Sequence, residues 1–477
     1  MPSPPSRLPI PGIVAALLSL LLTASLFFVH PLTQDRPEPS QLRILTAVYC
    51  LAGASLLAAY LLLRRDFTPT TSRLALIFSL GMLVRLLSFT QPPQYETDFH
   101  RFLWDGAVTA HGLSPYTTPP AAAHSSASLA PLAATAHPTL SHINHPELTT
   151  IYPPIAQAFF ALAYFISPFD TVALRAVFLL ADLAILGLLL HLLPTLGRPQ
   201  LAVILYWWNP VVIKEFYLAA HMDAIAIVFA LAAFALVLAN RRKAGMIVLA
   251  LAVGVKLWPV LLAPLLIRYR SPSIRSTVLH ALLFSSVAAL ASFPLLTSWD
   301  APTTSGLSAY ALWWTNNAGL FSLVDYALFK LAEYGVPMLT DPVRVGRYLS
   351  AMLTAAWLAF LLLPSLSTPR TLARWAAIAL SIFFLLSPTQ FPWYYTWALP
   401  FLVLSPLPAL FLYTALIPLY HLQYLHPAVL WVQHVPVWLL LLPSLRAGRD
   451  LTPASPNATP SSESTSTAGG VSPSFPR

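Results

Sequence analysis

The sequence predicts an all-α protein that crosses a membrane many times. Hydrophobic residues make up 57% of the 477 residues and charged residues only 9%, and the mean hydropathy is +0.69. Apolar runs recur along the chain, and about 20 residues of this kind suffice to cross a bilayer as a helix. Strands of a membrane β-barrel would instead alternate over segments of about ten residues. We therefore expect a polytopic bundle of about 12–14 transmembrane helices.

The first three expected spans precede a long polar segment. They cover residues 10–29, 42–63 and 74–89. The first is too long for the core of a signal peptide and has no small-residue cleavage site, so we expect it to remain as an anchor. Residues 1–73 thus carry N-terminal extra helices ahead of a transmembrane core at 74–296.

The remaining chain continues the pattern of apolar spans and polar connections. Six spans of the core are expected at 152–166, 171–193, 201–218, 224–238, 245–267 and 276–296. An outer loop at 297–345 and C-terminal transmembrane helices at 346–444 follow, and prolines break the last apolar stretch, 393–442. Residues 445–477 predict a disordered tail, because their Ser, Thr, Pro and Gly bury too little apolar surface to fold.

Positive charges at the ends of the spans indicate the orientation. Most Lys and Arg residues behind the net charge of +9 lie in short connections, which follows the positive-inside rule and does not indicate binding to nucleic acid. Arg64, Arg65 and Arg73 mark the connection after the second span as cytoplasmic, so residues 91–150 form an outer loop. We expect an integral, multi-pass protein of the cytoplasmic (inner) membrane with its site facing outward.

One basic turn conflicts with simple alternation of the spans. Alternation from residue 152 onward would put Asn240-Arg-Arg-Lys243 on the outer face. A short or re-entrant helix between 152 and 198, together with another between 245 and 268 that is broken at Pro259, would remove the conflict. The sequence leaves the helix pairing open.

The first outer loop, residues 91–150, concentrates the charge that is scarce elsewhere. It holds six of the 13 histidines and four acids, Glu96, Asp98, Asp105 and Glu147. Residues 99–110 can form an amphipathic helix lying on the membrane surface, with Asp98 at its N-cap.

Each candidate in this loop has a structural alternative. Asp98 is a candidate general base, yet capping a helix, worth about 1 kcal/mol, would also explain it. Arg101 is a candidate ligand for phosphate. Trp104 and Asp105 suit a structural role as well as a role in the reaction. An indole is typical of the interfacial belt, and an aspartate can bind the backbone of a loop.

Ionisable residues between apolar runs form a second group of candidates. His221 and Asp223 stand where two runs meet, and charge at membrane depth indicates function, with a helix cap as the alternative. His221 could bind a sugar or join a carboxylate as a metal ligand, but two ligands do not define a metal site. The sequence therefore assigns no metal ligand and leaves a divalent cation open as cofactor. The single cysteine, Cys50, excludes an intramolecular disulfide.

Cations within the spans need anionic partners. Lys256 stands alone in a long apolar stretch, so it either contacts a lipid phosphate or extends to the interface. Lys214 is a candidate for binding or a simple partner of Glu215. Arg85 lies inside a span and requires an acid or a phosphate beside it.

The outer loop at 297–345 combines aromatic rings with amides, among them Trp313 and Asn316. Ring faces stack on the C–H surfaces of sugars and amides pair with hydroxyls. An interfacial aromatic belt uses the same residue types, so both interpretations remain open.

Several motifs follow one another in order along the chain. They are Asp98 after a span, Arg101-Phe-Leu-Trp104-Asp105-Gly106, Gly112-Leu-Ser-Pro115-Tyr116, Tyr152-Pro-Pro154 with Gln157, Trp208-Asn209-Pro210 with Lys214-Glu215, His221-Met-Asp223 and Val255-Lys256-Leu257-Trp258-Pro259. As an ordered set they resemble polyprenyl-phosphate-sugar-dependent glycosyltransferases of the GT-C superfamily, in its bacterial mannosyltransferase-like branch. The resemblance covers roughly residues 75–400.

The resemblance implies transfer of a hexose, commonly mannose, from a polyprenyl-phosphate carrier to a glycan or lipid acceptor on the non-cytoplasmic face of the membrane. Asp98 occupies the position of the family's general base, and Tyr152 falls in a substrate-binding motif. A carboxylate that takes a hydroxyl proton, and cations that stabilise the departing phosphate, suit this chemistry. The His-Pro-Asp-Glu form of some relatives is absent here, so Glu96 or Asp105 is left to fill the second acidic role.

A polytopic transporter or flippase of lipid-linked sugars is the alternative function. Such a protein should show internal symmetry and coupling acids at the middle of the membrane. Here the acids gather in a loop, which favours the enzyme.

Overall fold

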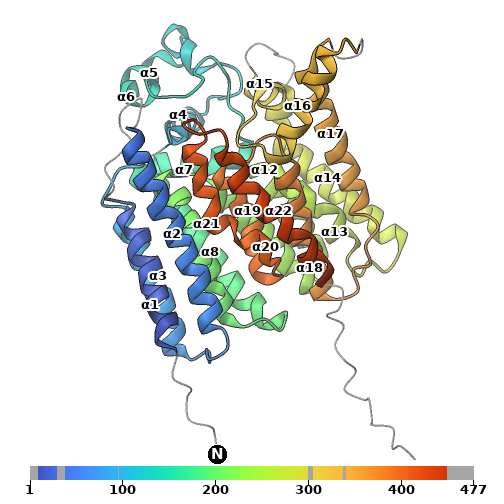
Figure 1. Ribbon diagram of the computed structural model, residues 1–477. Coiled ribbons are helices and arrows are strands. Elements are labelled where there is room, and N and C mark those ends of the chain that lie inside the picture. The colour runs from blue at the N-terminus through green and yellow to red at the C-terminus, as the bar shows by residue number, and fades with distance from the viewer. Residues whose placement is uncertain (1–8, 29–37, 95, 299–304, 337–339, 448–477) are drawn as a thin grey trace, which may run out of the picture.

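The structure is a computed structural model that describes residues 9–28, 38–94, 96–298, 305–336 and 340–447. Helices make up 75% of it, and its described residues contain one isolated β-bridge and no strand. Five helices are long and apolar enough to cross a membrane, namely α2 (Pro39–Leu63), α3 (Thr71–Ser88), α8 (Thr171–Thr195), α14 (Ile274–Thr297) and α18 (Pro369–Leu386). The prediction of an all-α polytopic membrane protein is confirmed (Figure 1).

The N-terminal helices form a hairpin against the rest of the bundle. In α1 (Ile10–Ser25), the Ser19 hydroxyl donates to the Ala52 carbonyl of α2 at 2.9 Å. Gly53 of α2 touches the backbone at Thr414, where an added Cβ would lie 2.1 Å from the carbonyl oxygen. A glycine is therefore needed where this hairpin meets the C-terminal helices.

A buried ion pair joins α3 to α8. The Arg85 Nε lies 2.7 Å from Asp182 Oδ2, and both side chains are fully buried. The hydroxyls of Tyr206 and Tyr217 each donate to the same carboxylate at 2.7 Å. The partner that Arg85 requires is thus an acid of the protein.

The first outer loop is built on α4 (Asp98–Ala110) and α7 (Pro154–Ile166), which pack side by side. An added Cβ on Gly106 of α4 would lie 2.5 Å from the Phe160 carbonyl oxygen of α7. Three short helices cover the other side of α4, η1 (Pro120–Ser125), α5 (Ala130–Thr135) and α6 (His137–Leu140). The expected amphipathic helix is present, but protein covers both of its faces.

Two of the expected core spans are interrupted. In place of one span at 201–218 there are four short turns, η2 (Gln200–Val203), α9 (Ile204–Trp207), α10 (Pro210–Ile213) and η3 (Lys214–Leu218), followed by α11 (Asp223–Leu238). The span expected at 245–267 is divided into α12 (Arg242–Val255), η4 (Trp258–Leu262) and α13 (Ala263–Arg268). The break falls at Lys256, which has extended backbone, just ahead of Pro259.

Arginine side chains tie several connections together at one end of the bundle, which we term the basic end. The bonds, 2.7–3.2 Å long, run from Arg242 to the carbonyls of Ile267 and Arg270, from Arg268 to Pro364, from Arg270 to Ser367 and from Arg370 to Leu196. The basic turn at 240–243 therefore lies at the same end as the connections after α8 and α13.

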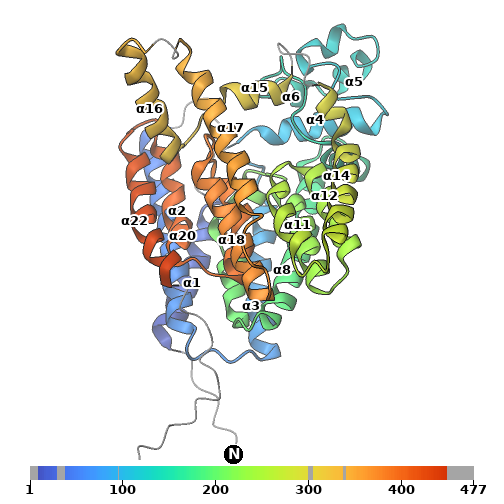
Figure 2. The same cartoon turned by 90° about the vertical axis from the view of Figure 1, so that its right-hand side faces the viewer.

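The position of α7 explains why simple alternation of the expected spans predicted the wrong side of the membrane for the basic turn at 240–243. Arg175, near the start of α8, donates to the carbonyls of Ser88 and Gln91 at 3.0 Å each, at the end of α3. The segment between α3 and α8 thus begins and ends on one side, and α7 adds no crossing. Figures 1 and 2 show α4, α5 and α6 gathered at this end, opposite the N-terminus.

The C-terminal helices complete the bundle. The stretch expected as an outer loop, 297–345, contains α15 (Gly306–Trp313) and α16 (Gly319–Glu333), and α17 (Pro342–Phe360) begins near its end. After α18 come α19 (Pro392–Leu404), α20 (Pro408–Phe411), α21 (Tyr413–Leu416), η6 (Ile417–Leu422) and α22 (Val429–Ala447). Residues 448–477 of the predicted tail lie outside the described residues.

Candidate active site

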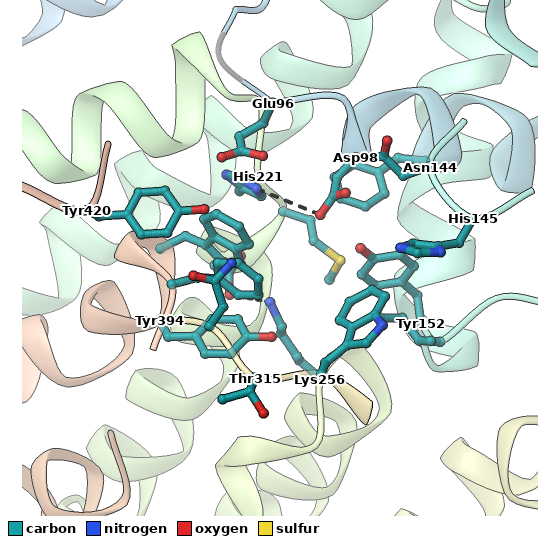
Figure 3. Close-up of a pocket in the computed structure, with 18 of the residues that line it drawn as sticks. Glu96, Asp98, Asn144, His145, Tyr152, His221, Lys256, Thr315, Tyr394 and Tyr420 are labelled. Atoms are coloured by element: carbon teal, nitrogen blue, oxygen red, sulfur yellow. Dashed lines mark hydrogen bonds and ion pairs between the residues drawn. The ribbon is translucent and has the colours of Figure 1, made fainter. Parts of the chain in front are cut away.

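A cavity of about 440 Å³ opens at the end of the bundle away from the basic end. Segments far apart in the sequence meet there, from the start of α4 to η6 (Figure 3). Eight of the candidate residues line it, Glu96, Asp98, Tyr152, His221, Asp223, Lys256, Trp313 and Asn316. Scarce charged groups and a histidine from three separate segments thus line one cavity.

Asp98 is the first residue of α4, and its side chain is 31% exposed. The prediction that it caps the helix is wrong, because Thr97 occupies the N-cap and no side chain caps this end. The Thr97 hydroxyl instead accepts a hydrogen bond from the Asn144 amide at 2.5 Å. Asp98 is therefore available for contacts within the cavity.

Glu96 lies two residues before Asp98 and is half-buried. Removal from water raises the pKa of its carboxyl to about 7, although the interactions with Lys214 and His221 act to lower it. The carboxylates of Asp98 and Glu215 raise it further. Near neutral pH, Glu96 can therefore either donate or accept a hydrogen bond.

His221 connects Asp98 to a buried ion pair. Its Nε2 lies 3.9 Å from Asp98 Oδ2, and its Nδ1 lies 3.1 Å from Glu215 Oε2. Glu215 also binds Lys214 Nζ at 3.0 Å, and both side chains of this pair are buried. The ring of Trp393 stacks on the imidazole with centroids 3.8 Å apart.

Lys256 provides the cation of the cavity. The break after α12 lets its side chain reach Asp223, with Nζ 2.6 Å from Oδ1. The Trp397 indole donates to the same carboxylate. Nζ also lies 5.0 Å from the centroid of the Tyr394 ring, a cation–π contact. The Lys256 side chain is 18% exposed, so its ammonium can meet an anion that enters the cavity.

The aromatic wall of the cavity comes from the C-terminal half of the chain. Trp313 is 62% exposed and can offer a ring face to a ligand. The side-chain amide of Asn316 is engaged within the protein, accepting from Gln423 at 2.9 Å and donating to the Tyr424 hydroxyl at 3.2 Å. Asn316 also forms the β-bridge to Thr389, so it joins two loops of the wall.

Four candidates lie outside the lining of the cavity. Arg101 donates to the carbonyls of His145 and Leu148 at 3.0 and 2.8 Å, and so holds the loop that carries Asn144. Trp104 packs in an apolar cluster that includes Leu132 of α5 and Ile143.

Asp105 and Lys214 are buried. Asp105 accepts from the Gln157 amide at 3.3 Å, its Oδ1 lies 3.9 Å from the Arg101 guanidinium, and burial raises its pKa. Lys214 is held by Glu215 as described above. These contacts of Asp105 and Lys214 stabilise the fold around the cavity.

Sequence reasoning missed Glu215 and Trp393 as members of the site. Glu215 appeared only as a partner of Lys214, since the turn that brings it beneath His221 is not readable from residue types. Trp393 belongs to the aromatic run Phe391-Pro-Trp393-Tyr394-Tyr395, which resembles a late aromatic turn of the GT-C enzymes and indicated a lipid groove rather than a partner for His221. Among the described residues, no group of three or more His, Cys, Asp or Glu side chains could hold a metal ion.

Comparison with known proteins agrees with these features. The family model described as alpha-(1->6)-mannopyranosyltransferase, N-terminal domain, matches residues 13–270. No curated protein and no solved structure matches the chain. The matched region covers more than half of the chain and contains Asp98, His221, Asp223 and Lys256, and it confirms the resemblance drawn from the motifs. The chain therefore belongs to the alpha-(1->6)-mannopyranosyltransferase family and is a glycosyltransferase of the membrane.

Proposed function

We propose that the chain transfers mannose from a polyprenyl-phosphate carrier to a hydroxyl of a glycan or lipid acceptor, with Asp98 as general base. One observation carries the proposal, namely a single cavity that holds a partly exposed carboxylate, Asp98, together with the cation Lys256. A sugar phosphate needs both groups, because the acceptor must lose a proton while the phosphate leaves with negative charge.

In the reaction, the acceptor oxygen attacks C1 of the sugar and its proton passes to Asp98. The bond between C1 and the phosphate oxygen breaks, and both electrons remain on the phosphate. Lys256 stabilises this charge, since an ammonium has three donors and Asp223 engages one of them. The faces of Trp313 and Tyr394 offer stacking surfaces to the sugar.

Glu96 is our candidate for the second acidic role. It lies in the cavity two residues from Asp98, and its raised pKa allows it to accept from or donate to an acceptor hydroxyl. Asp105, the other candidate, is buried against Gln157 and Arg101 away from the cavity lining. We assign Asp105 to holding α4 in place.

We further propose that the cavity faces away from the cytoplasm, in the cytoplasmic membrane. The arginine-tied connections of the basic end fit the positive-inside rule for cytoplasmic loops. The cavity lies at the other end of the bundle, where a carrier lipid in the outer leaflet could present its phosphate.

Transfer by purified protein in lipid vesicles tests the proposal. Polyprenyl-phosphate mannose, other polyprenyl-phosphate sugars and nucleotide sugars are supplied separately, and mannosylated product is measured. We expect product from polyprenyl-phosphate mannose, and a loss of about 10²–10⁴-fold in Asp98→Asn. Asp341→Asn, which changes an exposed aspartate at the start of α17, is the matched control.

Two outcomes would overturn the proposal. Transfer from a nucleotide sugar alone would refute the carrier lipid. Movement of lipid-linked sugar across the vesicle membrane without any transfer would instead support the transporter function.

A further inference from the structure

The two ring nitrogens of His221 face two different carboxylates. Nδ1 lies 3.1 Å from Glu215 Oε2 and Nε2 lies 3.9 Å from Asp98 Oδ2. The ring is fixed from other directions as well, because it stacks on Trp393 and the His221 backbone N–H donates to the Glu215 carbonyl at 2.8 Å. Its orientation is thus set by elements that are independent of Asp98.

Both ring nitrogens of His221 are buried and neither makes a hydrogen bond within the described residues, but Nδ1 lies 3.1 Å from the Glu215 carboxylate, closer than Nε2 lies to Asp98. A carboxylate beside one nitrogen of an imidazole favours the proton there, which leaves a lone pair on the other nitrogen. Glu215 thus favours the tautomer with hydrogen on Nδ1. The basic Nε2 is then directed toward Asp98.

We propose that His221 receives the proton that Asp98 takes from the acceptor hydroxyl, and that Glu215 holds the imidazole for this step. The proposal rests on the proposed role of Asp98. The acceptor O–H bond breaks as the bond from oxygen to C1 forms, and the proton moves from Asp98 to Nε2. The imidazolium formed is paired with Glu215 and later releases its proton to water, so Asp98 is a carboxylate again for the next turnover.

The distance fits a step that tightens when substrate binds. At 3.9 Å, Nε2 and Oδ2 are about 1 Å beyond hydrogen-bond distance, and catalytic hydrogen bonds are often long before substrate arrives. The Asp98 side chain is partly exposed and can change rotamer, whereas the His221 ring is fixed. Asp98 is therefore the member that moves.

The charges around His221 suit a transient imidazolium. Glu96 faces it from the loop before α4 and Glu215 from η3, while Lys214 is paired to Glu215 and Trp393 covers the ring from α19. Three carboxylates and one lysine surround the imidazole. These carboxylates balance a positive charge on the imidazole. A proton that stayed on Asp98 would instead stop the next turnover.

Rescue of His221→Gly by added imidazole tests the proton transfer. Removing the ring leaves Trp393 as a stacking surface for free imidazole. We expect turnover to fall at least about tenfold with the donor KM changed less than about twofold, because the lost contact acts in the transition state. Imidazole should restore turnover, and methylimidazoles of higher pKa should restore it faster.

The control for rescue is His142→Gly, which removes an exposed histidine that stacks on His100 and is not among the residues that line the cavity. It should show neither the loss nor the rescue. Wild-type turnover in His221→Gly, or a loss that no imidazole restores, overturns the proton transfer. If Asp98→Asn keeps its activity, the proposed function itself fails, so the two failures are distinguishable.

The role of Glu215 is tested by the tautomer of His221 rather than by activity. In protein with ¹⁵N-labelled histidine, the resonances absent from His221→Gly identify this residue. Wild type should show hydrogen on Nδ1, Glu215→Asp should retain this preference and Glu215→Gln should lose it. Glu333→Gln, which removes an exposed partner of Lys330, is the matched control. An unchanged tautomer in Glu215→Gln would overturn the role of Glu215, and if that variant does not fold, the Glu215→Asp spectrum decides.

Discussion

At neutral pH, Glu96 exists as acid and carboxylate in comparable amounts, because burial raises its pKa to about 7. The folded protein therefore holds a proton on Glu96 that the unfolded chain releases at lower pH. Between the ordinary pKa of a glutamate, about 4.3, and about 7, the contribution of Glu96 to stability must fall as pH rises.

Glu96→Gln should remove this dependence. We expect its thermal unfolding midpoint, relative to wild type, to be higher at pH 8 than at pH 5, measured in detergent with the two proteins side by side. Glu333→Gln, an exposed glutamate, should keep a constant difference from wild type. A difference for Glu96→Gln that does not change with pH would contradict the raised pKa.

We expect the positive charge of Lys256 to stabilise the phosphate of the donor. Lys256→Met is expected to lower kcat/KM for polyprenyl-phosphate mannose by about 10²-fold or more, because one preorganised cation is lost where the phosphate charge develops. Lys256→Arg should retain part of the activity, and Lys330→Met, which changes an exposed lysine of α16, should retain all of it. An equal loss in Asp223→Asn would show that the ion pair matters rather than the cation.

Among single elements, the contact of α4 with α7 positions Asp98, the first residue of α4. Gly106→Ala would put a Cβ 2.5 Å from the Phe160 carbonyl oxygen, so the helices must separate. We expect a loss of about 1–3 kcal/mol in stability and a lower kcat, since Asp98 begins the same helix. Gly187→Ala in α8 is the control, because its Cβ would meet nothing within 4 Å. It should be neutral or stabilising in thermal unfolding.

The ion pair between α3 and α8 offers a second test of packing. Arg85→Met leaves the buried Asp182 without its cation, and breaking a buried pair costs about 3–5 kcal/mol. The double variant Arg85→Met with Asp182→Leu should recover much of that loss in thermal unfolding. No recovery would mean that the hydrogen bonds from the Tyr206 and Tyr217 hydroxyls to the Asp182 carboxylate contribute more to stability than the balance of charge does.

At the scale of the whole molecule, the orientation in the membrane can be measured with the single cysteine. Replacing Cys50 by serine gives a background in which one new cysteine reports its side of the membrane. Ser128→Cys in the outer loop should react with a membrane-impermeant thiol reagent in intact cells, and Ser367→Cys at the basic end should react only after lysis. The reverse pattern would put the cavity in the cytoplasm.

The fold class and several members of the site could be predicted because charge is scarce in this chain. Asp98, His221, Asp223 and Lys256 stood out against apolar sequence, and the structure brings them to one cavity. The bundle's path could not be predicted in the same way, because α7 has the composition of a span yet lies beside α4.

Residue type alone could not distinguish the residues that line the cavity from those that support its walls. Arg101 and Asp105 are as polar as Asp98, but the helix turns them toward Gln157 and the loop carbonyls. Asn316 lines the cavity while its amide is already occupied by Gln423 and Tyr424. Such distinctions depend on partners from distant parts of the chain.

The cavity is assembled from two halves of the polypeptide that carry different properties. Asp98, His221 and Lys256 all precede residue 270, whereas the aromatic wall from Trp313 to Tyr420 follows it. The two halves depend on each other, because Trp393 stacks on His221 and the Trp397 indole donates to Asp223. Exchange of the C-terminal half would therefore change the support of the reactive groups together with the shape of the cavity.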